Sequence, residues 1–210
     1  MKKQINFYRL IWLFFFVFFF CLMFQITLRY IPASRTASFL QIKQTEVEQV
    51  SIYIPVFYVH VYSAIVVLLA GFTQFNSNLL QKYSKLHRYL GYVYVITILL
   101  FAAPSGIFIG YFANGGLFAK ISFMLLGILW FTFTLKALQT ARKRDFAAHR
   151  NFMYRSFALT LSAITLRLWK VILVFLFHPA PMDVYQIIAW LGWIPNLLIA
   201  EWIIKKQSTL

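Results

Sequence analysis

The chain has 210 residues, of which 61% are hydrophobic and only 12% are charged, and its formal net charge is +15. A water-soluble fold of this size cannot hide so much apolar surface, so the composition excludes a soluble domain and predicts a protein embedded in lipid. The basic residues stand between long apolar runs instead of forming a patch on a soluble face, so we expect no nucleic-acid partner.

Six apolar runs predict an all-α bundle of six transmembrane helices in a single domain, residues 1–210. Each run is long enough to cross a hydrocarbon core of about 30 Å at roughly 1.5 Å per residue. The first run follows Lys2, Lys3 and Arg9, is too long for a signal peptide and is interpreted as an uncleaved anchor. We expect helices two to five, residues 52–177, to form the functional core. The runs cover residues 10–28, 52–75, 89–109, 118–138, 152–177 and 184–204.

The basic residues also predict the topology. Threading the six runs in alternation places fourteen Lys and Arg residues on one side and four on the other, with Arg167 and Lys170 inside a helix. The more positive side faces the cytoplasm, which gives an N-in, C-in, multi-pass protein of a bacterial cell membrane. We expect its cytoplasmic loops to contact anionic lipid headgroups.

Prolines predict bends in two of the helices. Pro104, followed by serine and glycine, is expected to kink helix three near its outer end, and Pro195 is expected to kink helix six. The segment 30–50 is expected to lie outside, before helix two.

Helix two carries a histidine on a face of small and polar residues. Small residues such as Ala64 and Gly71 favour close helix packing, and a histidine can be a packing residue as well. His60, however, lies about 13 Å below the outer boundary, where a polar side chain is costly. Packing and a functional role are both open for it.

Helix five has a polar face that extends past the middle of the membrane. Lys170 can extend to the outer headgroups, whereas Arg167 lies about 15 Å from the outer end, near the depth of His60. None of the five acidic residues is expected at that depth, because Glu201 matches Arg155 instead. Arg167 must therefore use carbonyls, water, Asn196 or an anionic ligand. The face consists of His149, Met153, Ser156, Thr160, Ala163, Arg167 and Lys170.

His-Arg dipeptides mark the inner ends of helices three and five. His87 and His149 stand at one depth on separate helices and could ligate a b-type haem axially, which makes them the candidate metal ligands if haem is bound. Arg88 and Arg150 would then pair with the haem propionates, and Gly91 would allow the macrocycle to approach its helix closely. Alternatively, the two dipeptides bind lipid phosphate.

The phrases at 86–95 and 149–160, together with His60, the sequence at 71–75 and the ProSerGly at 104–106, resemble a bacterial family of predicted membrane proteins. This family is named only for its domain of unknown function 2306. The resemblance covers residues 55 to 175 and implies an integral membrane protein without an established activity.

Helices two to five are also similar, more loosely, to the core of diheme transmembrane cytochromes of the ascorbate-reductase type. Those proteins use four helical histidines in two pairs. Here helix four has none and His178 falls in an outer loop, so at most one such site, His87 with His149, is implied. In this comparison His60 has no second histidine with which to ligate a haem.

Three functional hypotheses follow. The first is a membrane redox component that carries haem b or handles a quinone, with or without a redox partner, through His60, His87, His149 and Arg167. The second is a small transporter or a lipid- or anion-binding membrane protein with a polar cavity at Arg167. The third is an accessory scaffold for another membrane complex. No catalytic residue follows from the sequence.

Overall fold

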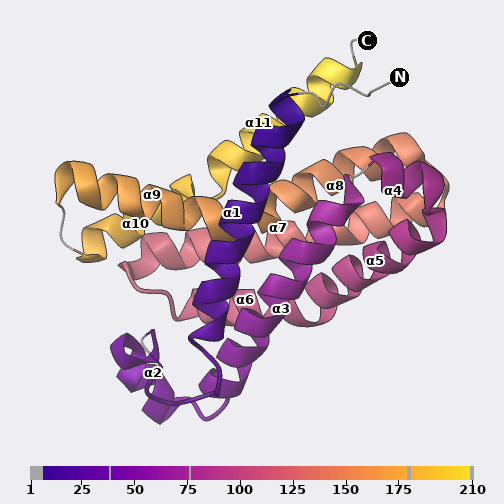
Figure 1. Cartoon of the computed structure of the whole chain (residues 1–210). Helices are drawn as coiled ribbons and strands as arrows, with labels where there is room; N and C mark the ends of the chain where they lie inside the picture. The colour runs from indigo at the N-terminus through magenta and orange to yellow at the C-terminus, as the bar shows by residue number, and fades with distance from the viewer. Residues whose placement is uncertain (1–6, 38, 76, 179–180, 209–210) are drawn as a thin grey trace.

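The computed structural model describes residues 7–37, 39–75, 77–178 and 181–208, and its regular elements over these ranges are all helical (Figure 1). The predicted all-α class is confirmed. The elements are α1 Phe7–Leu28, η1 Leu40–Lys43, α2 Gln44–Gln49, α3 Tyr53–Gln74, α4 Ser77–Lys82, α5 Ser84–Thr97, the π-helix η2 Ile98–Ala102, α6 Ala103–Tyr111, α7 Gly116–Arg142, α8 Phe146–Thr160, α9 Ser162–Phe177, α10 Pro181–Leu191 and α11 Ile194–Ser208.

Four helices of the described chain are long and apolar enough to cross a membrane: Tyr53–Gln74, Ser84–Tyr111, Gly116–Arg142 and Asp183–Gln207. The pair α8 and α9, bent by 40°, makes a fifth if it forms one span. The segment Val17–Leu28 of α1 is apolar but shorter. Long apolar helices are thus confirmed for runs two, three, four and six, whereas six spans and the N-in, C-in orientation stay predictions.

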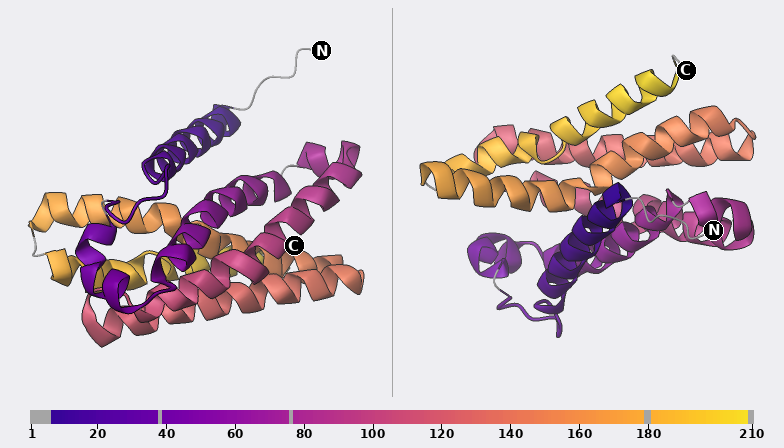
Figure 2. Two further views of the ribbon diagram at one scale, coloured as in Figure 1. Left: turned by 90° about the horizontal axis from the view of Figure 1, so that it is seen from below. Right: turned by 45° about the horizontal axis from the view of Figure 1, so that its top comes forward.

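Helices α3, α5–α6, α7 and α8 form a ring around one core. α7 packs along α6 on one side and α8 on the other, while α3 packs along α5 and touches α8. In this order α5 and α8 lie on opposite sides of the ring, and Val67, Tyr94, Ile98, Trp130 and Leu159 fill the space between the four helices. α1 packs on α3 at the edge of the bundle (Figure 2).

The two ends of the bundle are named here after the predicted topology. The inner end is where α4 and α5 begin and α7 gives way to α8, and the outer end is where α6 turns into α7 and α9 into α10 (Figure 1). The short helices η1 and α2 lie at the outer end, within the segment 30–50 that the sequence assigned there.

Pro104 and Pro195 both stand next to interruptions of regular α-helix. The π-helix η2 directly precedes Pro104, where the extra residue in the turn relieves the clash of the proline ring with the helix before it. Pro195 is the second residue of α11, which starts just after the chain breaks at Gly192 and Trp193. The sequence did not predict the bend at Leu161, which divides run five into α8 and α9. Neither proline nor glycine stands at this bend.

Helices five and six are both broken, and side chains near each break donate hydrogen bonds to backbone carbonyls at the other break. Ala158 lies in the last turn of α8, where carbonyls lose their helical donors, and its oxygen accepts a hydrogen bond of 3.2 Å from the Asn196 amide. Thr165 accepts from the same amide at 2.9 Å and donates to the Gly192 carbonyl at 2.5 Å. Because an unsatisfied backbone group in lipid is costly, this connection explains how helix five can break without a proline.

Candidate functional site

The polar face of α8 is buried against its neighbours. Ser156 Oγ lies 2.8 Å from the Tyr94 hydroxyl of α5 and 2.7 Å from Thr134 Oγ1 of α7. Thr160 Oγ1 bonds the same tyrosine at 2.9 Å and accepts from Trp130 Nε1 at 3.1 Å. All five side chains are buried, so between the inner end and the bend this face is a hydrogen-bonded packing interface.

The Tyr94–Ser156 bond also sets the register of α5 against α8. His87 stands seven residues before Tyr94, and His149 stands seven residues before Ser156. Seven residues are two helical turns. His87 therefore lies on the same helix face as Tyr94, and His149 on the same face as Ser156, each about 10 Å closer to the inner end. The two histidines are therefore at one level, as the sequence predicted.

The orientation of His149 is fixed by α7. Its Nδ1 lies 2.8 Å from the Ala137 carbonyl oxygen, and because a carbonyl only accepts, Nδ1 carries the proton. In the neutral imidazole, Nε2 then keeps the lone pair, which is the arrangement that metal-binding histidines use.

His87 has neither nitrogen hydrogen-bonded within the described residues, and its Nδ1 is buried. His149 stands on α8, which lies across the ring of helices from α5. The neighbouring Arg88 and Arg150 are both exposed. His87 and His149 thus stand at one level at the inner end, on helices that lie across the ring of helices from each other, and an arginine follows each in sequence.

The ligands available at this end suit a group that needs only two from the protein. Over the described residues, no three of His, Cys, Asp and Glu are placed to hold a metal ion together. Two imidazoles on separate helices are the residue types of the axial ligand set of a b-type haem. Gly91, expected to face the macrocycle, is covered by Gln74: a Cβ there would lie 3.0 Å from Gln74 Oε1. That amide would have to move to admit a planar group.

His60 lies away from this pair and anchors α3 to the π-helix. Its Nδ1 is 3.1 Å from the Ala102 carbonyl and 3.3 Å from Ser105 Oγ, and a Cβ on Gly106 would come within 3.1 Å of its ring. Ala102 is fifteen residues after His87 on the same bent helix, roughly 22 Å further out at helical rise. His60 is thus a packing residue, and its Nε2 makes no hydrogen bond within the described chain.

Arg167 stands on α9 beyond the bend, near His60. It is exposed, and it donates to the Ala163 carbonyl of its own helix. Its charge interacts with His60 of α3, with Tyr30 after α1 and with Tyr185 of α10. The shared depth of Arg167 and His60 stays a prediction, whereas Asn196, one of the acceptors considered for Arg167, is used by the helix breaks.

Arg155 and Glu201 form the ion pair that the sequence predicted from their depth. Arg155 Nε and Nη2 donate to the two carboxylate oxygens at 2.5 and 2.8 Å, joining α8 to α11. Tyr30 and Tyr185, which lie near Arg167, were missed because their positions depend on which helices pack together. Gln74 belongs to the same polar face of helix two as His60, but its contact with Gly91 could not be predicted from the sequence. Tyr94 alone had a signal, since it lies on the helical face of His87 and Gly91.

Comparisons with known proteins give one match. No curated protein and no solved structure matches the chain. A family model described as predicted membrane protein DUF2306 matches residues 57–204, which is more than half of the chain and includes both histidines of the inner end, His60 and Arg167. This family resemblance, expected from the sequence motifs, is confirmed. The protein therefore belongs to the DUF2306 family of predicted membrane proteins.

Proposed function

We propose that this membrane protein is a redox component that holds one b-type haem between His87 and His149. The observation that carries the proposal is the placement of two imidazoles at one level on opposite helices, with a buried nitrogen of His87 left without a hydrogen bond in the described chain. A buried polar atom without a partner costs about 1–3 kcal/mol. Native proteins keep few such atoms, and a bound group is one reason for keeping them.

The surrounding residues favour axial ligation. The Ala137 carbonyl holds the His149 proton on Nδ1 and leaves the lone pair of Nε2 available to ligate iron. The Tyr94–Ser156 bond keeps α5 and α8 in register two turns further out. Arg88 and Arg150, exposed at the ends of the same helices, are suited to the propionates of a haem at this depth. Bound haem supplies one-electron chemistry between ferric and ferrous iron.

The inner end of the bundle also carries exposed basic residues. Arg142, Lys143 and Arg144 are exposed in the turn between α7 and α8, close in sequence to the proposed haem site. We propose that they contact anionic headgroups on the cytoplasmic face of a bacterial cell membrane. Such contacts would hold the basic end of the bundle at that surface, where a soluble electron donor or acceptor can reach it.

The test is the visible spectrum of the purified full-length protein, as isolated or after addition of haemin. We expect a Soret band that shifts on reduction and is lost in His87→Ala and in His149→Ala. His60→Ala and His178→Ala are matched controls, because they remove a histidine elsewhere in the chain, and both should keep the band. A well-folded, colourless protein that does not take up haemin would contradict the proposal, as would equal loss in all four variants.

A further inference from the structure

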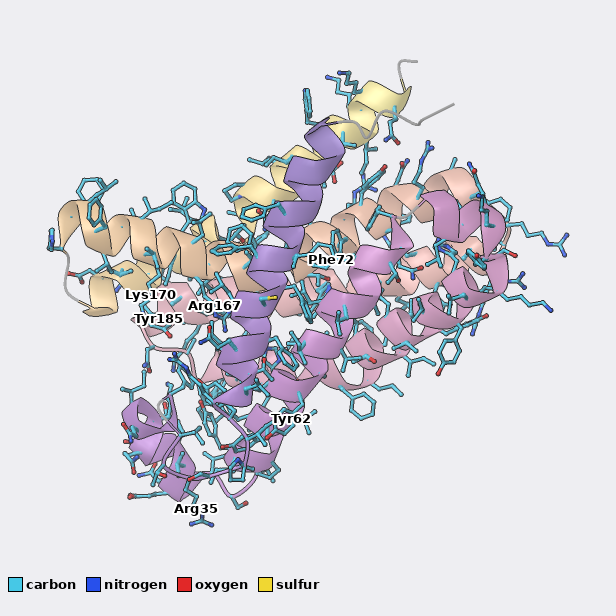
Figure 3. All side chains as sticks on the ribbon, in the orientation of Figure 1. Arg35, Tyr62, Phe72, Arg167, Lys170 and Tyr185 are labelled. Atoms are coloured by element: carbon cyan, nitrogen blue, oxygen red, sulfur yellow. The ribbon has the colours of Figure 1, made fainter. Side chains whose placement is uncertain are left out.

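We infer that Arg167, Lys170 and Tyr185 form a binding site for an oxyanion in the outer half of the bundle, separate from the histidine pair. Figure 3 shows the three labelled side chains in the same part of the view, beside α9 and α10. Arg167 and Lys170 are three residues apart, on one face of α9, and Tyr185 comes from α10.

The first argument is that no carboxylate of the described residues pairs with Arg167. All five acidic residues lie in the described ranges, and two of them, Glu46 and Glu201, are already paired with Lys43 and Arg155. Asp145 accepts a hydrogen bond from the backbone of α8 at the inner end. The remaining two, Glu48 and Asp183, are exposed and make no ion pair with Arg167.

The second argument is that its hydrogen-bonding capacity is largely unused. A guanidinium has five N–H donors, and within the described chain Arg167 uses one nitrogen, toward the Ala163 carbonyl one turn before it. The hydroxyl of Tyr185 likewise makes no hydrogen bond among the described residues. Donors that are left free at this depth need an acceptor from outside the chain.

The third argument concerns where the guanidinium lies. A basic side chain near a helix end can extend along the lipid to the headgroups, but Arg167 is ten residues before the last residue of α9, or about 15 Å. The groups with which its charge interacts belong to three other parts of the bundle: Tyr30, His60 and Tyr185. The side chain of Arg167 is exposed, so the guanidinium is accessible to a ligand at this depth.

These donors match the chemistry of an oxyanion. The planar fork of arginine binds two oxygens of a phosphate or carboxylate at once, Lys170 adds a second positive charge, and Tyr185 adds a neutral donor. The oxyanion has two available sources, a free ion that enters from the outer side or the headgroup of an anionic lipid. An apolar recess of about 290 Å³ between Leu173, Phe177, Val184 and Ile187, on the same two helices, makes the lipid source worth testing separately.

The experiment measures thermal unfolding of the purified full-length protein. One arm titrates inorganic phosphate against chloride at equal ionic strength in a neutral detergent. The other compares mixed micelles that contain phosphatidylglycerol with micelles that contain phosphatidylcholine. A ligand that binds the folded protein raises the Tm in a saturable way, so we expect a saturable rise of a few degrees in one of the two arms. The arm that responds identifies the source of the oxyanion.

The variants decide whether the effect comes from this site. Arg167→Leu should abolish the rise, and Arg167→Lys, which keeps the charge but loses the planar fork, should weaken it. Lys120→Leu is the matched control, because Lys120 is an outer cation that lies over the Tyr111 ring, and it should retain the full rise. His149→Ala should also retain it, so that failure of the haem proposal leaves this result interpretable. No saturable rise in either arm, or an equal rise in Arg167→Leu and the parent, would overturn the inference.

Discussion

The guanidinium of Arg155 and the carboxylate of Glu201 meet through two hydrogen bonds, of 2.5 and 2.8 Å, that join α8 to α11. The Arg155 cation also lies over the Phe152 ring of its own helix, 5.3 Å from the ring centre, so it is held on two sides. This contact fixes α11 against the ring of four helices, close to the level at which the histidine pair stands.

Removing one member of this pair should destabilise the protein more than removing both. Arg155→Met leaves the Glu201 carboxylate without its donors, and we expect it to lower the free energy of unfolding by about 1–3 kcal/mol. The double variant Arg155→Met with Glu201→Met replaces both charges by apolar groups and should recover most of that loss. Thermal unfolding in detergent measures all three, and additive losses in the double variant would contradict the predicted coupling.

The connection between the two helix breaks should depend on the Thr165 hydroxyl. Thr165→Val leaves the Gly192 carbonyl without this donor and removes an acceptor of the Asn196 amide, so we expect it to cost about 1–3 kcal/mol of stability. Thr132→Val is the control, because the Thr132 hydroxyl bonds the Ile128 carbonyl of its own helix. Equal thermal stability of the two variants would show that the connection contributes nothing.

The buried network around Tyr94 should be sensitive to the loss of one small hydroxyl. Ser156→Ala removes the partner shared by Tyr94 and Thr134, and we expect a loss of about 1–3 kcal/mol because both hydroxyls stay buried. Ser63→Ala is the comparison, since the buried Ser63 hydroxyl bonds only the His60 carbonyl of its own helix. Chemical denaturation in mixed micelles measures the difference, and a milder effect for Ser156→Ala than for Ser63→Ala would refute the prediction.

Topology is tested by reporter fusions. The fourteen-to-four bias of basic residues predicts that a reporter after Leu210 and one near Lys143 are cytoplasmic, and that one near Asn114 is external. In the structure Asn114 and Lys143 stand at the two ends of α7, so they must report opposite sides if that helix spans the membrane. An external signal from the reporter at Lys143 would reject the N-in, C-in orientation.

Depth along a helix could be predicted from the sequence, and lateral position could not. The hydrocarbon thickness fixes the length of each apolar run, so the rise per residue was enough to match Arg155 with Glu201. The same arithmetic cannot say which side chain occupies a given gap. Asn196 suited Arg167 by depth but serves the Ala158 carbonyl, and Gly91 suited an approaching macrocycle but meets Gln74.

The bend at Leu161 shows a different limit. Kinks at Pro104 and Pro195 follow from local chemistry, because proline removes a donor wherever it stands in a helix. The bend in helix five depends on donors that come from helix six, more than thirty residues later in the chain. Local sequence at 158–162 contains no sign of it, since the stabilising groups belong to another segment.

The connected breaks have a consequence for the way this protein enters the membrane. Helix five is synthesised before helix six, and until Asn196 leaves the ribosome the bent form of helix five lacks the side chain that donates to the Ala158 carbonyl. We therefore expect helix five either to insert first as a straight helix and bend later, or to wait beside the insertion machinery for helix six. In both cases helices five and six mature as one unit, and the position of Arg167 becomes final only after Asn196 has been synthesised.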